Sequence, residues 1–510
     1  MTTRPVLLPP ALPLAALRRA AMALLPWLLA IMVGLIAGTA GTQPRLAGAG
    51  FGVVLLVLVG LRLLRRPMLG LELMAVILPF FPMFRNAGTY LGIGLPYGIL
   101  GLWPEVVLSV MLVSVAVRAI KAGGKLQVRR DVFPFLVMTV GCAYGVSLTI
   151  SMREYVSAMY GFHGTFLGYF LFWVTYWLRP TPAETRRFIG LWLVSYTVFA
   201  LLSLADYIFR PAFIIELAML ARPDFWGTWE PHMFFRWYPR MQSLLFAEQM
   251  WGTACALVSL YCLSWYSERK RPRFILFVFV LSTLCVALSM SRGSLVCWCV
   301  GIVALLFSRG RHRVAVLVAL TMVAGAVMAS VVYLGGSDKI DTLTQRAMAL
   351  FESKDNSAYN RVDQWKFAFE LFPLFPSGRG LGRGGPSAAL HGINDGFPAI
   401  VDGGYFTVLT EQGVPGTLLY VFGGLGVVGA FARKGRELER AGDREGLVLC
   451  RATGAFFCGA LVQTFAGLTL EFYYVSSVFW ILAGLVMARR LPPGELEPAT
   501  KPAGLLPPVS

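Results

Sequence analysis

The sequence predicts an all-α integral membrane protein with about 12–14 transmembrane helices. Of its 510 residues, 57% are hydrophobic and 14% are charged, and the mean hydropathy is +0.66. A soluble chain of this length would expose too much apolar surface at that composition. Apolar runs of about 17–25 residues, the length that crosses a bilayer core, recur along most of the chain.

The distribution of charge indicates how the chain is oriented. The formal net charge is +18, but the basic residues cluster in short loops between apolar runs. This is the positive-inside pattern of membrane proteins rather than a nucleic-acid surface. It places both termini in the cytoplasm and predicts no nucleic-acid partner.

The spans are placed in chain order by apolar length and by the basic loops between them. The first apolar stretch is interpreted as a helix rather than a cleaved signal peptide, because it extends for about 20 residues and many spans follow. Two segments, about 80–100 and about 150–180, could be re-entrant, which leaves the number of helices between 12 and 14. The predicted spans are about 20–40, 46–63, 68–84, 99–117, 132–150, 160–178, 188–209, 243–266 and 274–290, a tenth before the basic loop 309–313, 314–333, 404–431, and two more ending at 489–490.

These spans divide the chain into four parts. Residues 1–333 hold helices 1–11 and an outward segment at about 210–242, and residues 334–403 form one long outward loop. Residues 404–490 hold helices 12–14, and residues 491–510 form a Pro-rich cytoplasmic tail. Any reaction on polar substrates is expected at the two outward segments.

Cysteine and histidine usage does not indicate a metal or disulfide framework. All eight cysteines lie in or beside apolar segments, and the four histidines are scattered. HExxH, G-x-S-x-G and Walker sequences do not occur in the sequence. We therefore expect metal-independent chemistry without a cofactor.

Two charged positions stand out in the middle of the chain. In "YPRMQSLLFAEQMWG", Arg240 precedes an apolar helix and Glu248 lies about two turns inside it, although Arg240 could simply anchor the helix at the interface. In "SMSRGSLVCW", Arg292 is the only charge between Arg273 and Arg309. A charge at membrane depth costs about 2.5–3.5 kcal/mol on insertion scales, so Arg292 is expected to face a polar cavity or an anion.

The long loop contains a helical stretch followed by a Gly-Arg turn. Apolar residues around Trp365 recur at helical spacing after Arg361, and prolines then end the pattern. Residues 380–385 fit G-x-G-x-x-G, but no βαβ unit surrounds them, which excludes a dinucleotide site. The turn is predicted to be backbone-exposed, with Arg379 and Arg383 suited to phosphate or pyrophosphate; a solvated loop is the alternative.

A further motif, "VDGGYFTVLTEQGVPG", begins at residue 401. It places Asp402 and Tyr405 at the start of a membrane helix and Glu411 about two turns inside it. Gly413, Pro415 and Gly416 predict a bend that would let a lipid or glycan approach.

Taken together, residues 235–430 resemble the O-antigen polymerase and O-antigen ligase superfamily (Wzy/WaaL-like). The motifs that carry the resemblance are an Arg before a middle helix, "SRG" at a helix end, a long late loop with Arg, Trp and a Gly-rich run, and the acid-containing motif after it. Each is weak alone, and their order and spacing are more specific.

The resemblance implies an inner-membrane glycosyltransferase that moves a glycan from an undecaprenyl-pyrophosphate donor to an acceptor hydroxyl at the periplasmic face. It implies metal-independent, inverting chemistry among membrane lipids, and allows a chain-length regulator or export complex as partner. Arg240 and Arg292 would neutralise the leaving pyrophosphate. Asp402 would be the base or an orienting group, with Glu411 as its partner, an alternative base, or a structural acid paired with an Arg.

The resemblance leaves the branch of the superfamily open. Ligases that transfer O-antigen to lipid A-core usually carry His-Asn where this sequence has Asp402-Gly403, whereas O-antigen and exopolysaccharide polymerases often carry Asp-Asn or a similar pair, which favours a polymerase. A lipid-linked oligosaccharide flippase or transporter would show internal repeats, and none is found. A glycan polymerase of another membrane family is a further alternative.

Overall fold

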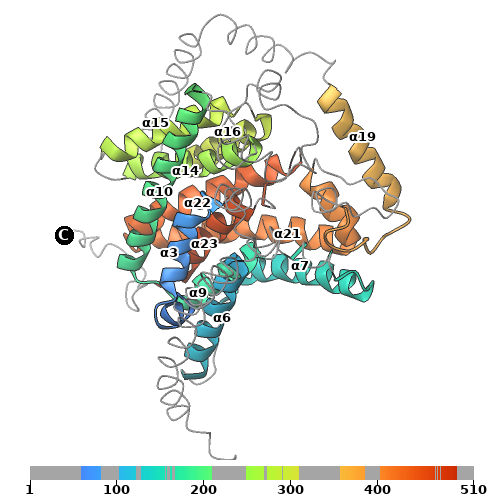
Figure 1. Ribbon diagram of the computed structural model, residues 1–510, viewed down its shortest axis with the longest axis horizontal. Coiled ribbons are helices and arrows are strands. Elements are labelled where there is room, and N and C mark those ends of the chain that lie inside the picture. The colour runs from blue at the N-terminus through green and yellow to red at the C-terminus, as the bar shows by residue number, and fades with distance from the viewer. Residues whose placement is uncertain are drawn as a thin grey trace, which may run out of the picture.

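The computed structural model describes residues 59–81, 103–121, 128–155, 157, 161–162, 167–209, 248–268, 273–289, 291–308, 356–384, 403–465, 467, 469–470 and 473–490. Within these ranges the regular structure is helical and contains no strand, so the predicted all-α class is confirmed (Figure 1). The helices are α3 (Met68–Ile77), α6 (Trp103–Lys121), the 3₁₀ turn η1 (Arg130–Val132), α7 (Phe133–Ser151), α9 (Leu167–Leu178), α10 (Pro182–Phe209), α14 (Glu248–Glu268), α15 (Arg273–Leu288), α16 (Arg292–Phe307), α19 (Asn356–Leu371), α21 (Gly404–Arg440), α22 (Arg444–Gln463) and α23 (Tyr473–Ala488).

Five helical stretches in the described ranges are long and apolar enough to cross a membrane, and they make this a multi-pass membrane protein. Shorter apolar helices accompany them, among them α9, α15 and α16. The predicted spans at about 20–40 and 314–333 lie outside the described residues, so the total of 12–14 stays a prediction. The five stretches are Trp103–Lys121, Arg130–Ser151, Pro182–Ile208, Gly404–Arg440 and Arg444–Gln463.

Close helix packing depends on small residues at the crossings. α7 and α21 run side by side (Figure 1), and a Cβ at Gly423 of α21 would lie 2.5 Å from Met138 Cγ. Between α16 and α22, a Cβ at Gly459 would lie 2.1 Å from the carbonyl oxygen of Cys297. Small residues are the usual means of bringing helices together in a bilayer, where apolar burial alone does not favour association.

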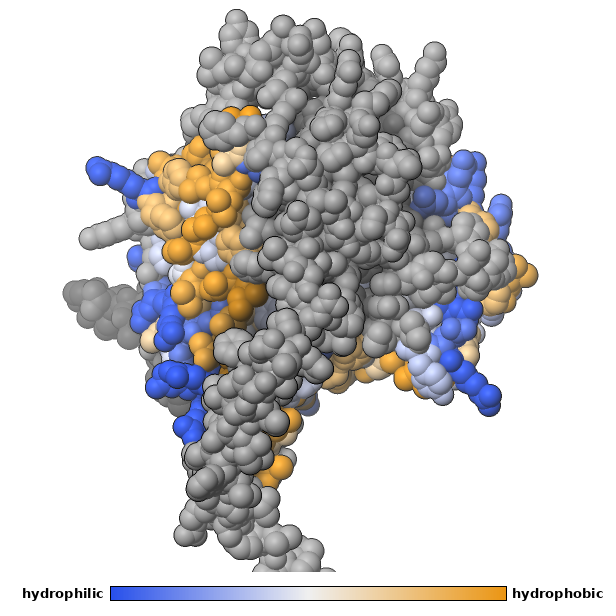
Figure 2. Space-filling view, viewed as in Figure 1, coloured by the Kyte–Doolittle hydropathy of each residue, from blue (hydrophilic) through white to orange (hydrophobic). Residues whose placement is uncertain are grey.

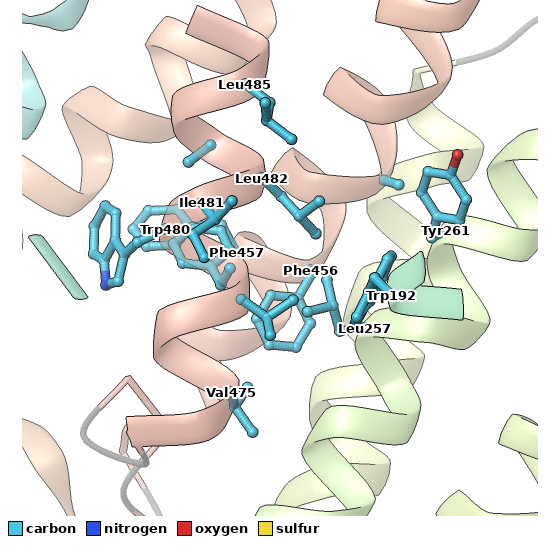
Figure 3. Packing of buried hydrophobic residues seen from close by; sticks show 14 of the residues in the cluster. Trp192, Leu257, Tyr261, Phe456, Phe457, Val475, Trp480, Ile481, Leu482 and Leu485 are labelled. Atoms are coloured by element: carbon cyan, nitrogen blue, oxygen red, sulfur yellow. The ribbon is translucent and has the colours of Figure 1, made fainter. Parts of the chain in front are cut away.

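Large side chains fill the core where α10, α14, α22 and α23 meet. Figure 3 shows Trp192 of α10 and Leu257 of α14 pointing toward Phe456 of α22, with Trp480 of α23 on the other side of this group. The rings of Phe457 and Trp480 meet edge to face with centroids 6.3 Å apart. This aromatic core joins elements from widely separated parts of the sequence.

The outer surface is unusually apolar for a chain in water. Phe422 is 66% exposed and Leu425 is 61% exposed, both on α21. The described residues on the left of Figure 2 form a hydrophobic patch with hydrophilic side chains along its outer edge. Large exposed apolar areas of this kind indicate contact with lipid or protein.

Basic residues that follow the apolar spans gather at one end of the helices. Arg186 at the start of α10 lies 3.4 Å from Glu445 at the start of α22, and Arg489 after α23 pairs with Asp443 before α22. Lys434 of α21 donates to the carbonyl oxygen of Arg489 at 2.8 Å. That this end lies on the cytoplasmic side stays a prediction from the positive-inside pattern.

Two local predictions are confirmed. The helical stretch of the long loop is α19, and the bend of the following span is a break at Gly413, where φ is 63° and ψ is −161°. All eight cysteines are free, so none forms a disulfide. The helix predicted over 404–431 extends to Arg440, because the basic segment after the apolar run continues the same helix.

Candidate functional site

The first part of the candidate site is the start of α16, where the "SRG" motif lies. Ser291 is the N-cap, and its hydroxyl accepts a hydrogen bond from the Ser294 N–H at 3.3 Å. Gly293 lets α22 approach, since a Cβ there would lie 3.2 Å from Gln463 Nε2. Arg292 is exposed at the first position of the helix.

Arg292 is a cation where the helix dipole favours an anion. The first N–H groups of a helix carry a partial positive charge, and an arginine beside them adds to it. The local field therefore suits a negatively charged ligand such as phosphate. That Arg292 faces an anion stays a prediction.

Beside this arginine lies a buried polar cluster formed by Gln249, Thr253, Ser294 and Gln463. Gln463 Nε2 donates to Thr253 Oγ1 at 3.0 Å, and Thr253 Oγ1 lies 3.1 Å from Ser294 Oγ. Ser294 Oγ donates to the carbonyl oxygen of Gln249 at 2.9 Å. The sequence did not predict this cluster, because its only signal is a few amide and hydroxyl residues inside apolar spans.

The start of α21 adjoins the polar cluster. The Gly404 N–H donates to the carbonyl oxygens of Thr464 at 2.8 Å and Gly467 at 3.2 Å. Gly467 in turn packs against Gln249, whose Nε2 would lie 2.1 Å from a Cβ at that glycine. The connection after α22 therefore links the acid-containing motif to the helices that carry Arg292.

Aromatic side chains cover this junction. Trp365 of α19 stacks on Phe406 with centroids 5.0 Å apart and an interplanar angle of 17°. The Tyr405 hydroxyl donates to the carbonyl oxygen of Leu461 at 3.0 Å. Trp365 and Tyr405, both predicted as substrate-binding, thus lie at the start of α21, although the Tyr405 hydroxyl bonds to the protein itself.

The second part is the Gly-Arg turn, residues 376–384, which packs against the break in α21. The prediction of an exposed turn is wrong, because Arg379 is only 2% exposed and the glycines around it are buried. The physical reason is that the turn fills the space opened by the break. The same finding corrects the role predicted for the bend, since the chain's own backbone occupies it at Gly413.

Glu411 lies where the turn meets α21. Its Oε1 accepts a hydrogen bond from the Gly384 N–H at 3.0 Å, and the residue is 6% exposed. It also lines a small, mostly apolar pocket together with Cys142, Tyr169 and Gln412. Arg383 is less buried than Arg379, and its Nη1 lies 3.5 Å from Met152 Sδ.

The two parts are connected by the first turns of α21. Glu411 lies seven positions after Gly404, which at the rise of an α-helix corresponds to about 10 Å. Arg292, Trp365 and Tyr405 belong to the first part, and Arg379, Arg383 and Glu411 to the second. Asp402 and Arg240 lie outside the described residues, as do the side chains of Glu248 and Arg361. Among the residues that the structure describes, no three His, Cys, Asp or Glu side chains form a group that could hold a metal ion.

These features define a multi-pass membrane protein with a positively charged helix start, a buried polar cluster and a folded loop packed against a broken helix. Residues 277–421 match the family model Wzy_C, described as O-antigen ligase. The chain therefore carries a Wzy_C domain, the family that covers Wzy polymerases and WaaL ligases, and the predicted resemblance is confirmed. No curated protein matches the chain at a significant level of similarity.

The match includes most of α15 together with α16, α19, the Gly-Arg turn and the broken part of α21. It thus covers every predicted site residue except Arg240 and Glu248. Members of the family are membrane glycosyltransferases that use lipid-linked glycans. The chain thus contains a Wzy_C domain, and the family of that domain acts in O-antigen or polysaccharide polymerisation or ligation.

Proposed function

We propose that the protein is a polysaccharide polymerase of the bacterial inner membrane. It transfers a growing O-antigen or exopolysaccharide chain from undecaprenyl pyrophosphate to a sugar hydroxyl of a second lipid-linked repeat unit, at the periplasmic face. The carbon–oxygen bond to the pyrophosphate breaks as the acceptor oxygen attacks from the opposite side of the sugar carbon. The reaction inverts the configuration of that carbon and needs no metal ion.

In this proposal the arginines act on the donor. The pyrophosphate leaves with the electron pair of the broken bond, and its growing negative charge is stabilised by guanidinium groups held in place beforehand. Arg292 suits this role because it is exposed at a positively charged helix start. Arg240 is the second proposed ligand, placed by the sequence before the helix that contributes Gln249 to the polar cluster.

Asp402 is the proposed base, which takes the proton of the acceptor hydroxyl as the new bond forms. It directly precedes Gly403, the residue before the start of α21. Trp365, packed at this helix start, offers an apolar face on which a sugar ring can lie. Arg361, Arg379, Arg383 and Glu248 are proposed to support substrate binding from the surrounding segments.

The observation that carries the polymerase assignment is Asp402, an acid at the position where the ligases that this chain resembles usually carry a histidine. The next residue, Gly403, has a φ of 108° and a ψ of 94°, a conformation that favours glycine. A Cβ there would lie 3.0 Å from Trp365 Nε1 and 3.0 Å from Phe406 Cδ2. This crowding accounts for glycine in this chain but does not separate the branches, because ligases usually carry His-Asn and polymerases often carry Asp-Asn or a similar pair at these two positions.

The ligase branch is the second candidate, because the matching family model is described as O-antigen ligase. The polymerase and ligase branches can be distinguished by supplying the purified protein with one donor, a lipid-linked repeat unit, and with one of two acceptors. The acceptors are a second lipid-linked repeat unit and lipid A-core. A polymerase forms a ladder of lipid-linked chains from repeat units alone. Product formed only when lipid A-core is added would overturn the proposal in favour of a ligase.

A further inference from the structure

The break in α21 leaves two carbonyl groups without their helical partners. In an unbroken helix the carbonyl oxygens of Thr410 and Glu411 would accept from the N–H groups four residues later, at Val414 and Pro415. Proline has no N–H. The Val414 N–H is directed elsewhere and donates to the Pro376 carbonyl oxygen at 3.0 Å.

The Gly-Arg turn supplies the missing donors. The Arg379 N–H donates to the Thr410 carbonyl oxygen at 2.9 Å, and the Gly380 N–H donates to the Glu411 carbonyl oxygen at 2.9 Å. With the Val414 bond, three backbone hydrogen bonds join the turn to the broken helix. The turn therefore completes the hydrogen bonding of α21 from a distant part of the sequence.

The fit between turn and helix depends on glycine. Gly378 has a φ of 94°, and a Cβ there would lie 2.4 Å from the Glu411 carbonyl oxygen. Gly413 has a φ of 63°, and its Cβ would lie 2.2 Å from the Pro376 carbonyl oxygen. Both contacts are with backbone atoms, so neither can be relieved by turning a side chain.

The Glu411 side chain closes the far end of the turn. Its Oε1 accepts from the Gly384 N–H at 3.0 Å, so Glu411 bonds the turn through both its carbonyl and its carboxylate. From the other side, α7 contributes the Tyr144 hydroxyl, which donates to the Ser377 carbonyl oxygen at 2.8 Å. The turn is thus bonded to two membrane helices.

We propose that Glu411 is a positioning residue rather than a base. Its carboxylate holds the Gly-Arg turn docked, and the docked turn fixes the bend of α21. That bend sets where the first turns of α21, beginning at Gly404, lie relative to α16 and Arg292. The catalytic consequence rests on the proposed function, because it assumes that the segment preceding Gly404 acts on the acceptor while Arg292 acts on the donor.

Two substitutions of Glu411 separate positioning from base catalysis. Glu411→Gln keeps an oxygen that can accept from Gly384 but cannot take up a proton as a carboxylate does. Glu411→Met has a similar length and offers no oxygen. A positioning role predicts that the Gln variant transfers within about threefold of the original rate. The Met variant should transfer about 10²-fold slower with an unchanged KM for the donor, since a small misplacement of reacting groups has effects of that order.

Trypsin measures docking without any substrate. Trypsin cleaves the peptide bond after arginine. The bond after Arg379 is protected from trypsin while the turn is buried against α21. We expect the original protein and the Gln variant to resist cleavage at Arg379 and Arg383 in detergent, and the Met variant to be cut there, as read by mass spectrometry of the fragments. Gly429→Ala in the same helix is the matched control, because a Cβ there meets nothing within 4 Å.

Three results would overturn the proposal. A Met variant as resistant to trypsin as the original protein would show that the carboxylate does not hold the turn. A Met variant that is cut yet transfers normally would show that docking does not position the site. A Gln variant that resists trypsin but has lost transfer would identify the ionised carboxylate as the essential group.

A second variant keeps the test decisive if Glu411→Met does not fold. Gly378→Ala disturbs the same docking from the turn side, and it should reproduce both the cleavage and the slow transfer. Normal protection in a folded Gly378→Ala variant would likewise overturn the proposal. Because cleavage is read without substrate, absence of glycan transfer by the original protein would refute the proposed function while leaving the docking result to be judged separately.

Discussion

Gly252 of α14 is a position at which a single methyl group should disturb the proposed donor site around Arg292. A Cβ there would lie 2.4 Å from Ser289 Oγ and 2.7 Å from Ser294 Cβ. The hydroxyl can rotate, but Ser294 Cβ is attached to the backbone of α16. Ordinary contact begins at 3.4 Å, so the first turn of α16 must move by about 0.7 Å, which is 3.4 minus 2.7.

The effect of Gly252→Ala on stability should be modest. Overpacking of this size costs about 1–3 kcal/mol. Replacing glycine by alanine inside a helix returns about 1 kcal/mol. We therefore expect a net loss of about 0–2 kcal/mol, which a thermal unfolding measurement in detergent would show as a small decrease in Tm.

The effect on transfer should be larger, because Ser294 lies two residues after Arg292. A displacement of reacting groups by about 1 Å can cost about 10²-fold in rate. We expect Gly252→Ala to slow single-turnover transfer from a lipid-linked donor by about 10- to 100-fold. Gly190→Ala, where a Cβ meets nothing within 4 Å, is the control and should transfer normally.

A double variant tests the steric cause. Ser294→Gly removes the opposing Cβ, so Gly252→Ala combined with Ser294→Gly should recover part of the lost transfer rate even though the polar cluster loses a hydroxyl. If Gly252→Ala transfers at the original rate, the packing of α14 against α16 does not position Arg292. If the double variant is slower than Gly252→Ala, the loss arises from the hydroxyl network rather than from crowding.

Four other results are expected. Arg292→Lys keeps the charge but loses the planar fork that binds phosphate through two hydrogen bonds, so donor binding should weaken about tenfold; unchanged binding would exclude two-point recognition. Asp402→Asn should slow transfer by about 10²–10⁴-fold while donor binding, measured separately, stays intact; full activity would remove Asp402 as the base. Lys434→Met should lower stability in thermal unfolding by about 2 kcal/mol without affecting transfer, since the buried ammonium bonds Glu437 at 3.2 Å and the Arg489 carbonyl oxygen at 2.8 Å; an unchanged Tm would show that these bonds contribute little. Reporters fused near Asn356 should read periplasmic and those near Lys434 cytoplasmic, and the reverse would place the proposed site in the wrong compartment.

Features that depend on neighbouring residues could be predicted from the sequence. Apolar length predicted membrane helices, helical spacing around Trp365 predicted α19, and the Gly413–Pro415 pair predicted the break in α21. Each of these signals lies within a single helix. The order of the motifs along the chain also predicted the Wzy_C resemblance, because the order and spacing of the motifs are more specific than any one motif alone.

Features that depend on distant partners could not be predicted. Gly-Arg sequences are usually exposed, and the burial of Arg379 follows from a helix break more than thirty residues later in the chain. Gln463 has no periodic signal, and its role becomes visible only when α22 meets α14 and α16. In both cases the deciding interaction is a hydrogen bond between segments whose pairing the sequence does not specify.

The first turns of α21 explain why two acids stand nine residues apart around a membrane helix start. At one end, the Gly404 N–H is bonded to carbonyl oxygens of the α22–α23 connection, and at the other end Glu411 is bonded to the Gly-Arg turn. The segment between them is therefore fixed at both ends against different neighbours. A transfer that stabilises its leaving pyrophosphate with arginine side chains depends on how accurately donor and acceptor groups are placed. On this view Asp402 performs the chemistry proposed for it, and Glu411 contributes by keeping the helix that follows Asp402 in one place.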